Sequence, residues 1–196
     1  MLASQKKIIV LCGPSGAGKT SMARALLQHY GELSFSISAT TRPRRSGELE
    51  GVDYYFLNTS AFKQKIDRGD FLEYEEVYEG LFYGTLKDEL RRIWEEDHVP
   101  VLDVDVNGAM EIRGAQFCEG LFIFVHPGDV ETLRNRLQAR HTESGASLQR
   151  RLARAEMELE KAAEFGQLVY NDNFERARKQ IIELVGSYIG HEVERR

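Results

Sequence analysis

One stretch of this sequence decides its fold: Gly13-Pro14-Ser15-Gly16-Ala17-Gly18-Lys19-Thr20. It matches G-x-x-x-x-G-K-[ST] between an apolar run at 7–11, which predicts a buried strand, and a run at 19–29 with apolar residues at helical spacing. Glycines let such a loop turn its N–H groups inward, and the next helix presents its positive dipole end. The stretch predicts a phosphate-binding loop; the alternative is a glycine-rich turn that happens to precede a helix.

The side chains that end this loop suit a nucleoside triphosphate. Lys19 can reach the β and γ oxygens, and the Thr20 hydroxyl can ligate Mg²⁺. We therefore expect ATP as one substrate and Mg²⁺, arriving with ATP, as the cofactor, with no organic cofactor. The loop alone does not identify the second substrate.

Away from the loop, elements of different type alternate, which predicts an α/β fold with a parallel central sheet flanked by helices. The segment 34–38 alternates in polarity, and 60–68 predicts a short helix with Ser60 as its cap. The remaining predicted strands and helices are 99–106, 121–125, 130–140, 148–165, 168–170 and 174–189.

Composition limits the function classes. The chain has 196 residues, enough for a single domain, with 42% hydrophobic and 29% charged residues. A net charge of −5 argues against a nucleic-acid partner. No apolar run is long enough for a membrane span, and the N-terminal run is too short for a signal peptide, so we expect a cytoplasmic protein with no membrane partner. Cys12 and Cys118 predict two reduced, buried thiols.

A basic loop at 42–58 offers a second anion site. Arg42, Arg44 and Arg45 lie within four residues, and tyrosines follow them. Arginine forks bind phosphate oxygens, and tyrosine hydroxyls add neutral donors. Taken alone, the loop is equally compatible with a solvated basic segment.

The same loop carries a specific resemblance. Its pattern T-T-R-x-x-R-x-G-E-x-x-G-x-x-Y-x-F at 40–56 resembles the signature of guanylate kinases. Further motifs extend the resemblance from about residue 7 to about residue 185: Gly69-Asp70-Phe71-Leu72-Glu73-Tyr74, Tyr83-Gly84-Thr85, Leu102-Asp103-Val104-Asp105-Val106-Asn107-Gly108, Thr142-Glu143 with Arg150-Arg151-Leu152, and Val169-Tyr170-Asn171-Asp172.

The resemblance implies the nucleoside-monophosphate kinase fold and the transfer of the γ-phosphate of ATP to GMP, giving ADP and GDP, in purine nucleotide metabolism and GMP recycling. It divides the single domain into a core, a GMP-binding lobe and a mobile lid. The core is 1–37, 89–137 and 158–196, the lobe is 38–88, and the lid is 138–157. Oligomerisation with copies of itself stays open.

The resemblance also implies roles for individual residues. Catalysis is placed on Lys19, Arg45, Arg140 and Arg151. ATP binding is placed on Gly13, Pro14, Ser15, Gly16, Ala17, Gly18, Lys19, Thr20, Ser21, Arg136, Asn171 and Asp172. GMP binding is placed on Ser38, Arg42, Arg45, Tyr54, Glu73, Tyr83, Thr85, Asp103 and Asp105. Either Arg44 or Arg45 could be the second arginine that binds the GMP phosphate, because Pro43 comes one residue earlier than in the family pattern.

The guanine role of Glu73 has its own chemical reason. Guanine presents two parallel donors, N1–H and the N2 amino group, which a carboxylate matches with its two oxygens. Adenine offers no such pair and would leave a buried carboxylate unpaired. Local sequence alone favours a surface glutamate in an acidic run, and the family resemblance reverses that preference.

Asp103 and Asp105 are expected on one face of a strand by their period of two. At a strand's carboxyl end they would hold Mg²⁺ through water or bind the base, with the division between them left open. The alternative is that they cap a helix or anchor a loop.

The lid arginines Arg140 and Arg151 are expected to close onto the ATP phosphates, and the alternative is two salt-bridged surface helices.

Two rival functions remain. One is a guanylate-kinase-like module that binds phosphopeptides, and the intact loop at 13–20 argues against it. The other is a P-loop kinase for a ribosyl phosphate, and the Ser38 and Glu73 pair argues against that.

Overall fold

The fold is built on a five-stranded parallel sheet. The computed structural model describes residues 6–138 and 145–190 of the chain. The strand order is β2-β7-β1-β8-β9, and every neighbouring pair is parallel. The strands are β1 Lys7–Cys12, β2 Leu33–Phe35, β7 Val99–Asp103, β8 Glu119–His126 and β9 Gln167–Tyr170. The predicted α/β architecture with a parallel central sheet is confirmed.

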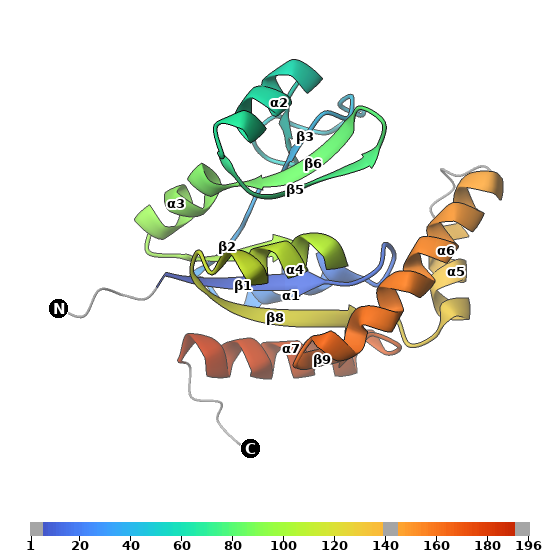
Figure 1. Cartoon of the computed structure of the whole chain (residues 1–196). Helices are drawn as coiled ribbons and strands as arrows, with labels where there is room; N and C mark the ends of the chain where they lie inside the picture. Colours follow the sequence, from blue (N-terminus) through green and yellow to red (C-terminus); the bar gives the residue numbers. More distant parts are fainter. Residues whose placement is uncertain (1–5, 139–144, 191–196) are drawn as a thin grey trace.

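The central strand β1 is buried on both faces, because its alternate side chains enter two different cores. Ile9 and Leu11 pack with α1 (Lys19–His29) and α7 (Phe174–Ile189). Ile8 and Val10 pack with residues of helices on the opposite face of the sheet. These helices are α3 (Lys87–Glu95) and α4 (Val106–Ala115). The two layers fix β1, and with it the loop that follows its carboxyl end (Figure 1).

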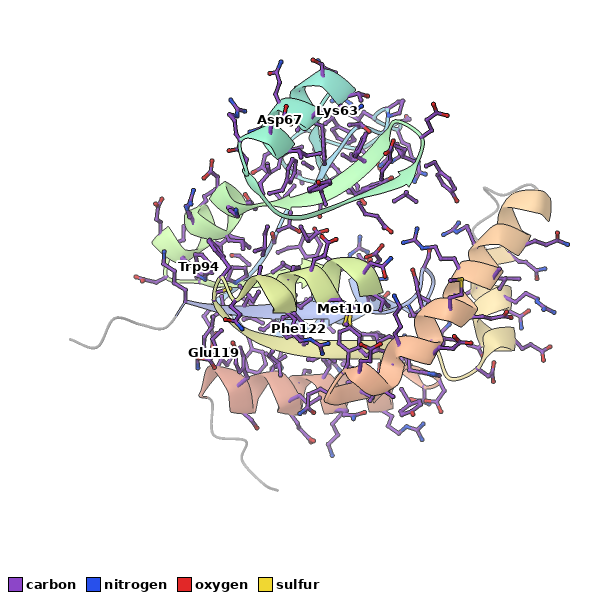
Figure 2. All side chains as sticks on the ribbon, viewed as in Figure 1. Lys63, Asp67, Trp94, Met110, Glu119 and Phe122 are labelled. Carbon is purple, nitrogen blue, oxygen red and sulfur yellow. The ribbon has the colours of Figure 1, made fainter. Side chains whose placement is uncertain are left out.

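A second, four-stranded sheet lies over the α4 side of the core (Figure 1). Its order is β4-β3-β6-β5, with bounds β3 Ala39–Thr40, β4 Tyr55–Phe56, β5 Phe71–Tyr78 and β6 Leu81–Leu86. Helix α2 (Thr59–Asp67) covers it through Phe62, whose ring stacks on Phe71 and Phe82 at centroid distances of 4.3 and 5.3 Å. Figure 2 labels Lys63 and Asp67 on α2, and the Lys63 ammonium lies 5.8 Å from the centroid of the Phe82 ring. This small aromatic core makes the second sheet a packed unit above the first.

Two further helices, α5 (Val130–Gln138) and α6 (Gly145–Glu160), stand beyond the end of the central sheet toward which β8 points (Figure 1). They pack on each other through Leu133, Leu152 and Ala155. A 3₁₀ turn, η1 (Lys161–Glu164), leads from α6 back to the core. The helix pair is thus joined to the sheet at its two ends and has a small core of its own.

Several local expectations differ from the structure. The helix predicted at 148–165 is α6, which runs from Gly145 to Glu160 and is followed by the 3₁₀ turn η1. The helix predicted at 60–68 begins at Thr59, and its cap is Asn58, whose side chain accepts from the Ala61 amide over 2.8 Å. Of the segment 34–38, whose polarity alternates, only the first two residues lie in a strand, because β2 is Leu33–Phe35. The strand predicted at 99–106 ends at Asp103, because α4 begins at Val106. Across residues 6–138 and 145–190, no helix has both the length and the apolar character needed to cross a membrane.

Candidate active site

The loop between β1 and α1 has a shape that requires glycine at two positions. Gly13 has φ +132°, and a Cβ there would lie 2.5 Å from the Val125 carbonyl oxygen. Gly18 has φ +100°, and a Cβ there would collide with the Asn171 side chain. Left-handed backbone and close approach both exclude larger residues. The two glycines therefore seat the loop against the ends of β8 and β9.

Three side chains meet where this loop faces the end of β7. The Lys19 ammonium donates to the carbonyls of Gly13 and Pro14 over 2.8 and 3.3 Å, and lies 3.7 Å from Asp103 Oδ1. The Thr20 hydroxyl donates to Asp103 Oδ2 over 2.6 Å. A cation, a hydroxyl and a carboxylate thus converge at the start of α1, where the helix dipole favours an anion.

The second-sheet side of the cleft is lined by a fixed guanidinium. Arg42 donates two parallel hydrogen bonds to Glu48, of 3.0 and 2.7 Å, and lies over the Tyr54 ring at 5.3 Å. The Glu48 bond raises the pKa of Arg42, and the Arg42 bond lowers the pKa of Glu48. Glu48 also accepts from the Arg45 amide over 2.8 Å. The tyrosine rings of Tyr54 and Tyr83 meet at 6.0 Å. This wall presents positive charge and phenol groups together.

Glu73 is a buried carboxylate on β5, with only 7% of its surface exposed. Its Oε1 accepts from the Thr85 hydroxyl over 2.7 Å. Burial raises the pKa of Glu73 to about 7, against the Thr85 bond, which acts to lower it. A Cβ at Gly108 would lie 2.9 Å from Glu73 Oε2, so glycine there leaves room for the carboxylate. The prediction of a surface glutamate from local sequence is therefore wrong, because the strand turns this side chain inward.

Asp105 is not a strand residue, which corrects the expectation that it shares a strand face with Asp103. It is the N-cap of α4, and its Oδ1 accepts from the Gly108 amide over 2.7 Å. The helix-capping alternative is correct for this residue. Burial opposes ionisation, but hydrogen bonds from Glu75 and Gly108 together with the Arg154 charge hold the pKa of Asp105 below its usual range. Burial and the bond to Asp105 raise the pKa of Glu75 to about 7.

Most of the predicted site residues line one cleft of about 520 Å³, a size typical of small-molecule sites. The predicted residues that line it are Ser15, Gly16, Gly18, Lys19, Thr20, Ser21, Ser38, Arg42, Arg45, Tyr54, Glu73, Tyr83, Asp103, Asp105 and Arg151. The predicted residues that lie outside its lining are Gly13, Pro14, Ala17, Thr85, Arg136, Asn171 and Asp172. Arg140 lies outside the described residues.

Several of the residues behind the lining brace the phosphate loop. The Arg136 guanidinium donates to the carbonyls of Asn171 and Ala17 over 2.6 and 3.3 Å. The Asn171 amide donates to the Ala17 carbonyl over 2.7 Å. From the cleft side, Arg151 on α6 donates to the Ser15 hydroxyl. Asp172 instead pairs with Arg176 on the surface of α7. The loop is thus held by contacts from three separate elements.

Comparison with known proteins gives the family. A family model described as "Guanylate kinase" matches residues 5–188. This chain belongs to the guanylate kinase family. A guanylate kinase of Salinibacter ruber is 41% identical over 184 residues, which cover 94% of this chain and 97% of that relative. One of Chlorobium chlorochromatii is 42% identical over 184 residues, covering 94% and 96%.

A solved structure agrees with the family. The crystal structure of a guanylate kinase from Anaplasma phagocytophilum superposes with a TM-score of 0.75 at 28% identity, covering 96% of this chain and 88% of that one. The resemblance recognised in the sequence is therefore confirmed, and the chain is a member of a family of ATP:GMP phosphotransferases. The nucleoside-monophosphate kinase type of enzyme fits a cleft that has a phosphate loop on one side and a second polar wall on the other.

Three charged lining residues, Glu75, Arg154 and Glu158, were missed by reasoning from the sequence. Arg154 and Glu75 both line the cleft and contact each other across it, with a shortest distance of 2.8 Å. In the sequence, Arg154 is one of several arginines on a charged helix, and Glu75 belongs to an acidic run. One signal could have found Glu75: it lies two residues from Glu73, so a strand places both on one face.

The oxygen atoms beside Lys19 form a donor set of the kind that Mg²⁺ takes. Mg²⁺ in phosphoryl-transfer sites takes one or two protein oxygens and otherwise keeps water and substrate phosphate. The Thr20 hydroxyl and the Asp103 carboxylate, 2.6 Å apart, supply such a pair at the mouth of the loop. Among the described residues there is no group of three or more His, Cys, Asp or Glu side chains that could form an all-protein metal cage. The donor set therefore fits Mg²⁺ carried by a nucleotide.

Proposed function

We propose that this chain transfers the γ-phosphoryl group of ATP to GMP within the cleft between the phosphate loop and the second sheet, giving ADP and GDP. The observation that carries the proposal is the buried Glu73 carboxylate, which lines the same cleft as Lys19. The phosphate loop accounts for ATP as the phosphoryl donor. The buried carboxylate, whose two oxygens can accept hydrogen bonds from guanine, accounts for GMP as the phosphoryl acceptor.

On the donor side, residues 13–21 cradle the triphosphate of ATP, with Lys19 at the β and γ oxygens. The contacts that Lys19 makes with two loop carbonyls hold its ammonium across the loop, ready to exchange these neutral partners for phosphate. Arg136 and Asn171 act mainly by bracing the loop at Ala17. Asp172 would lie toward the adenine, as the family resemblance implies.

On the acceptor side, Arg42, Arg45, Tyr54 and Tyr83 hold the GMP phosphate. Arg42 is already aligned by Glu48, so little side-chain freedom is lost when phosphate binds its remaining N–H groups. Arg45 lines the cleft, whereas Arg44 is not among its lining residues, which favours Arg45 as the second phosphate arginine.

The guanine base is read by Glu73, with Ser38, Thr85 and Asp105 assisting. Thr85 acts from behind, since it donates to Glu73 Oε1 and lies outside the cleft lining. Its hydroxyl fixes the plane of the carboxylate, so that both oxygens are set for the N1–H and N2 donors of guanine. Adenine would leave these oxygens unpaired in a buried place, which disfavours AMP.

Thr20 and Asp103 would hold Mg²⁺ beside the ATP phosphates. The ion would supply charge neutralisation of the β and γ phosphates. The residues of the chain provide alignment: Lys19 orients the donor phosphate, Arg42 and Arg45 orient the acceptor phosphate, and Arg151 approaches the loop from α6 at Ser15. GMP's own phosphate oxygen is the nucleophile, so no protein nucleophile or strong base is required.

We assign the segment 138–157 to a lid whose closure carries Arg140 and Arg151 onto the ATP phosphates and excludes water. The core, 1–37, 89–137 and 158–196, carries the donor site, and the lobe 38–88 carries the acceptor site. The metabolic role is purine nucleotide metabolism and GMP recycling in the cytoplasm.

A coupled assay tests the proposed function. Purified chain, ATP and Mg²⁺ are incubated with GMP, AMP, UMP or CMP in turn, and ADP release is followed. We expect turnover with GMP at least about 100-fold above that with the other three, because only guanine pairs with both oxygens of Glu73. A base-free ribose phosphate serves as a further acceptor. Turnover with that acceptor equal to GMP turnover, or no turnover with GMP, contradicts the proposal.

A further inference from the structure

One guanidinium in the cleft joins acidic side chains from three different elements. Arg154 on α6 donates through Nε to Glu158 Oε1 over 2.8 Å, within its own helix. Its terminal nitrogen donates to both oxygens of Glu75 on β5, over 2.9 and 2.8 Å. The same nitrogen donates to Oδ2 of Asp105 over 2.5 Å. We call these four residues the arginine–carboxylate cluster.

The cluster is shielded enough for these contacts to matter. The Arg154 side chain is 35% exposed, and the side chains of Glu75 and Asp105 are each 24% exposed. An exposed ion pair contributes little, whereas removing one partner of a shielded, hydrogen-bonded pair leaves the other charge uncompensated. Here the residues left without their cation would be three neighbouring acidic side chains, Glu75, Asp105 and Glu158.

The cluster lies against the carboxylate that we assign to guanine. Glu73 and Glu75 are two residues apart on β5, and the pairing of β5 with β6 has no register shift between them, so both side chains lie on one face. Asp105 caps α4 at Gly108, and Gly108 is the residue whose missing side chain leaves room for Glu73. Asp105 and Glu75 therefore line the same cleft as Glu73.

The same helix also reaches the donor side. Arg151 and Arg154 are three residues apart on α6, so they project from the same side of the helix. Arg151 contacts Ser15 in the phosphate loop, while Arg154 contacts Glu75 and Asp105. Helix α6 therefore spans the cleft, with one arginine at each substrate site.

We propose that Arg154 is a positioning residue that couples the two sites. It orients Asp105 and Glu75 beside Glu73, and by tying α6 to the acceptor wall it places Arg151 over the donor phosphates when GMP is bound. The inference rests on the proposed function, since it assigns the wall around Glu73 to GMP. The Glu158 contact alone would be an ordinary pair within one helix, and it is the contacts with β5 and with the cap of α4 that make the link.

Arg154→Gln tests the proposal, with Arg154→Lys as the conservative variant. We expect Arg154→Gln to lower kcat/KM for GMP roughly 10- to 100-fold, with KM for GMP raised and kcat lowered. Binding of a non-hydrolysable ATP analogue without GMP should stay within about twofold of wild type, because the phosphate loop keeps its own contacts. Arg154→Lys should recover part of the loss, since an ammonium restores charge without the planar fork.

The matched control is Arg91→Gln, which removes an exposed arginine paired with Asp88 on α3 and should leave all constants unchanged. Thermal unfolding of each variant separates positioning from folding. If Arg154→Gln does not fold, Arg154→Lys and Glu75→Gln carry the same comparison. A purely structural role for Arg154 would lower the unfolding temperature and weaken both nucleotides alike, and this outcome overturns the proposal.

A double-mutant cycle with Glu75→Gln gives the decisive number. Because both single variants break the same contact, the fold-loss of kcat/KM for GMP in the double variant should be smaller than the product of the two single fold-losses. Strict additivity, or an Arg154→Gln variant within twofold of wild type for GMP, also overturns the proposal. Wild-type GMP turnover is measured first: its absence overturns the proposed function and this inference together, whereas normal wild-type turnover with an unaffected Arg154→Gln variant overturns the inference alone.

Discussion

The Thr85 hydroxyl donates a hydrogen bond to Glu73 Oε1 over 2.7 Å, and both side chains are buried beside the cleft. We predict that Glu73→Gln weakens GMP by about 1–3 kcal/mol or more, because the amide places a donor opposite a guanine donor. ATP affinity should change little, since Glu73 lies on the second sheet. Calorimetric titration of each nucleotide separately measures both affinities.

The control for this prediction is Glu76→Gln, which neutralises an exposed glutamate on the same strand. It should leave GMP affinity within about twofold of wild type, because exposed charges contribute little. Equal weakening of ATP and GMP by Glu73→Gln would show instead that the carboxylate is structural.

The raised pKa of Glu73 predicts a pH dependence of stability. The pKa of Glu73 is raised from 4.5 to about 7 in the fold, so the native state binds this proton more tightly than the unfolded chain. Stability contributed by the protonated form is therefore present near pH 5 and lost as pH rises toward 8, by about 3 kcal/mol. Glu73→Gln stays neutral throughout. Denaturant titration measures the free energy of unfolding of both proteins. The value for wild type minus the value for Glu73→Gln should fall as pH rises.

An unchanged difference between pH 5 and pH 8 would mean that Glu73 is ionised throughout this range. Glu75, whose pKa is also about 7, is present in both proteins, so its contribution largely cancels in the comparison.

The sequence predicted correctly those helices whose hydrophobic periodicity alone identifies them. The helices at 19–29 and 174–189 are found at those bounds because their apolar residues recur at helical spacing and pack on the sheet. The strand at 99–106 was too long, because an apolar run does not reveal that Asp105 caps a following helix. The cap depends on a hydrogen bond from Gly108, which periodicity does not report.

For the site, the sequence predicted residue types better than their partners. The loop at 13–20 is recognisable because its chemistry is local and contiguous. Glu73 was recognised only through the family resemblance, since its burial depends on the register of β5 and β6. Arg154 and Glu75 are 79 residues apart in the chain, and no local pattern brings such a pair together.

The open choice between two arginines gives a further prediction. Arg45 lines the cleft, whereas Arg44 does not belong to its lining. Arg45→Ala should raise KM for GMP about tenfold or more through the loss of a charge-assisted phosphate contact. Arg44→Ala should change it less than about twofold and serves as the matched control. Steady-state kinetics at saturating ATP compare them, and the reverse order would assign the phosphate contact to Arg44.

Lys19→Ala should abolish phosphoryl transfer while leaving the fold largely intact. The ammonium is the positive charge of the phosphate loop, and its partners in the structure are two loop carbonyls and Asp103. Turnover is measured by the coupled assay and folding by circular dichroism. Lys63→Ala, on the distant helix α2, is the control (Figure 2). Near-normal turnover in Lys19→Ala would contradict the phosphate-loop assignment.

The last prediction concerns the lid arginines. Arg151 on α6 already contacts Ser15 of the phosphate loop, so a small inward movement of α6 would bring its guanidinium to the donor phosphates. Charge placed there stabilises the transition state more than the bound substrates. Arg151→Ala should therefore lower kcat by roughly 10²–10⁴ while GMP binding barely changes. The same result is expected for Arg140→Ala from the sequence. Arg134→Ala, exposed on α5, is the control. If Arg151→Ala and Arg140→Ala both keep kcat within a few fold of wild type, with GMP affinity checked by calorimetry, the lid arginines are surface charges and the mechanism is wrong.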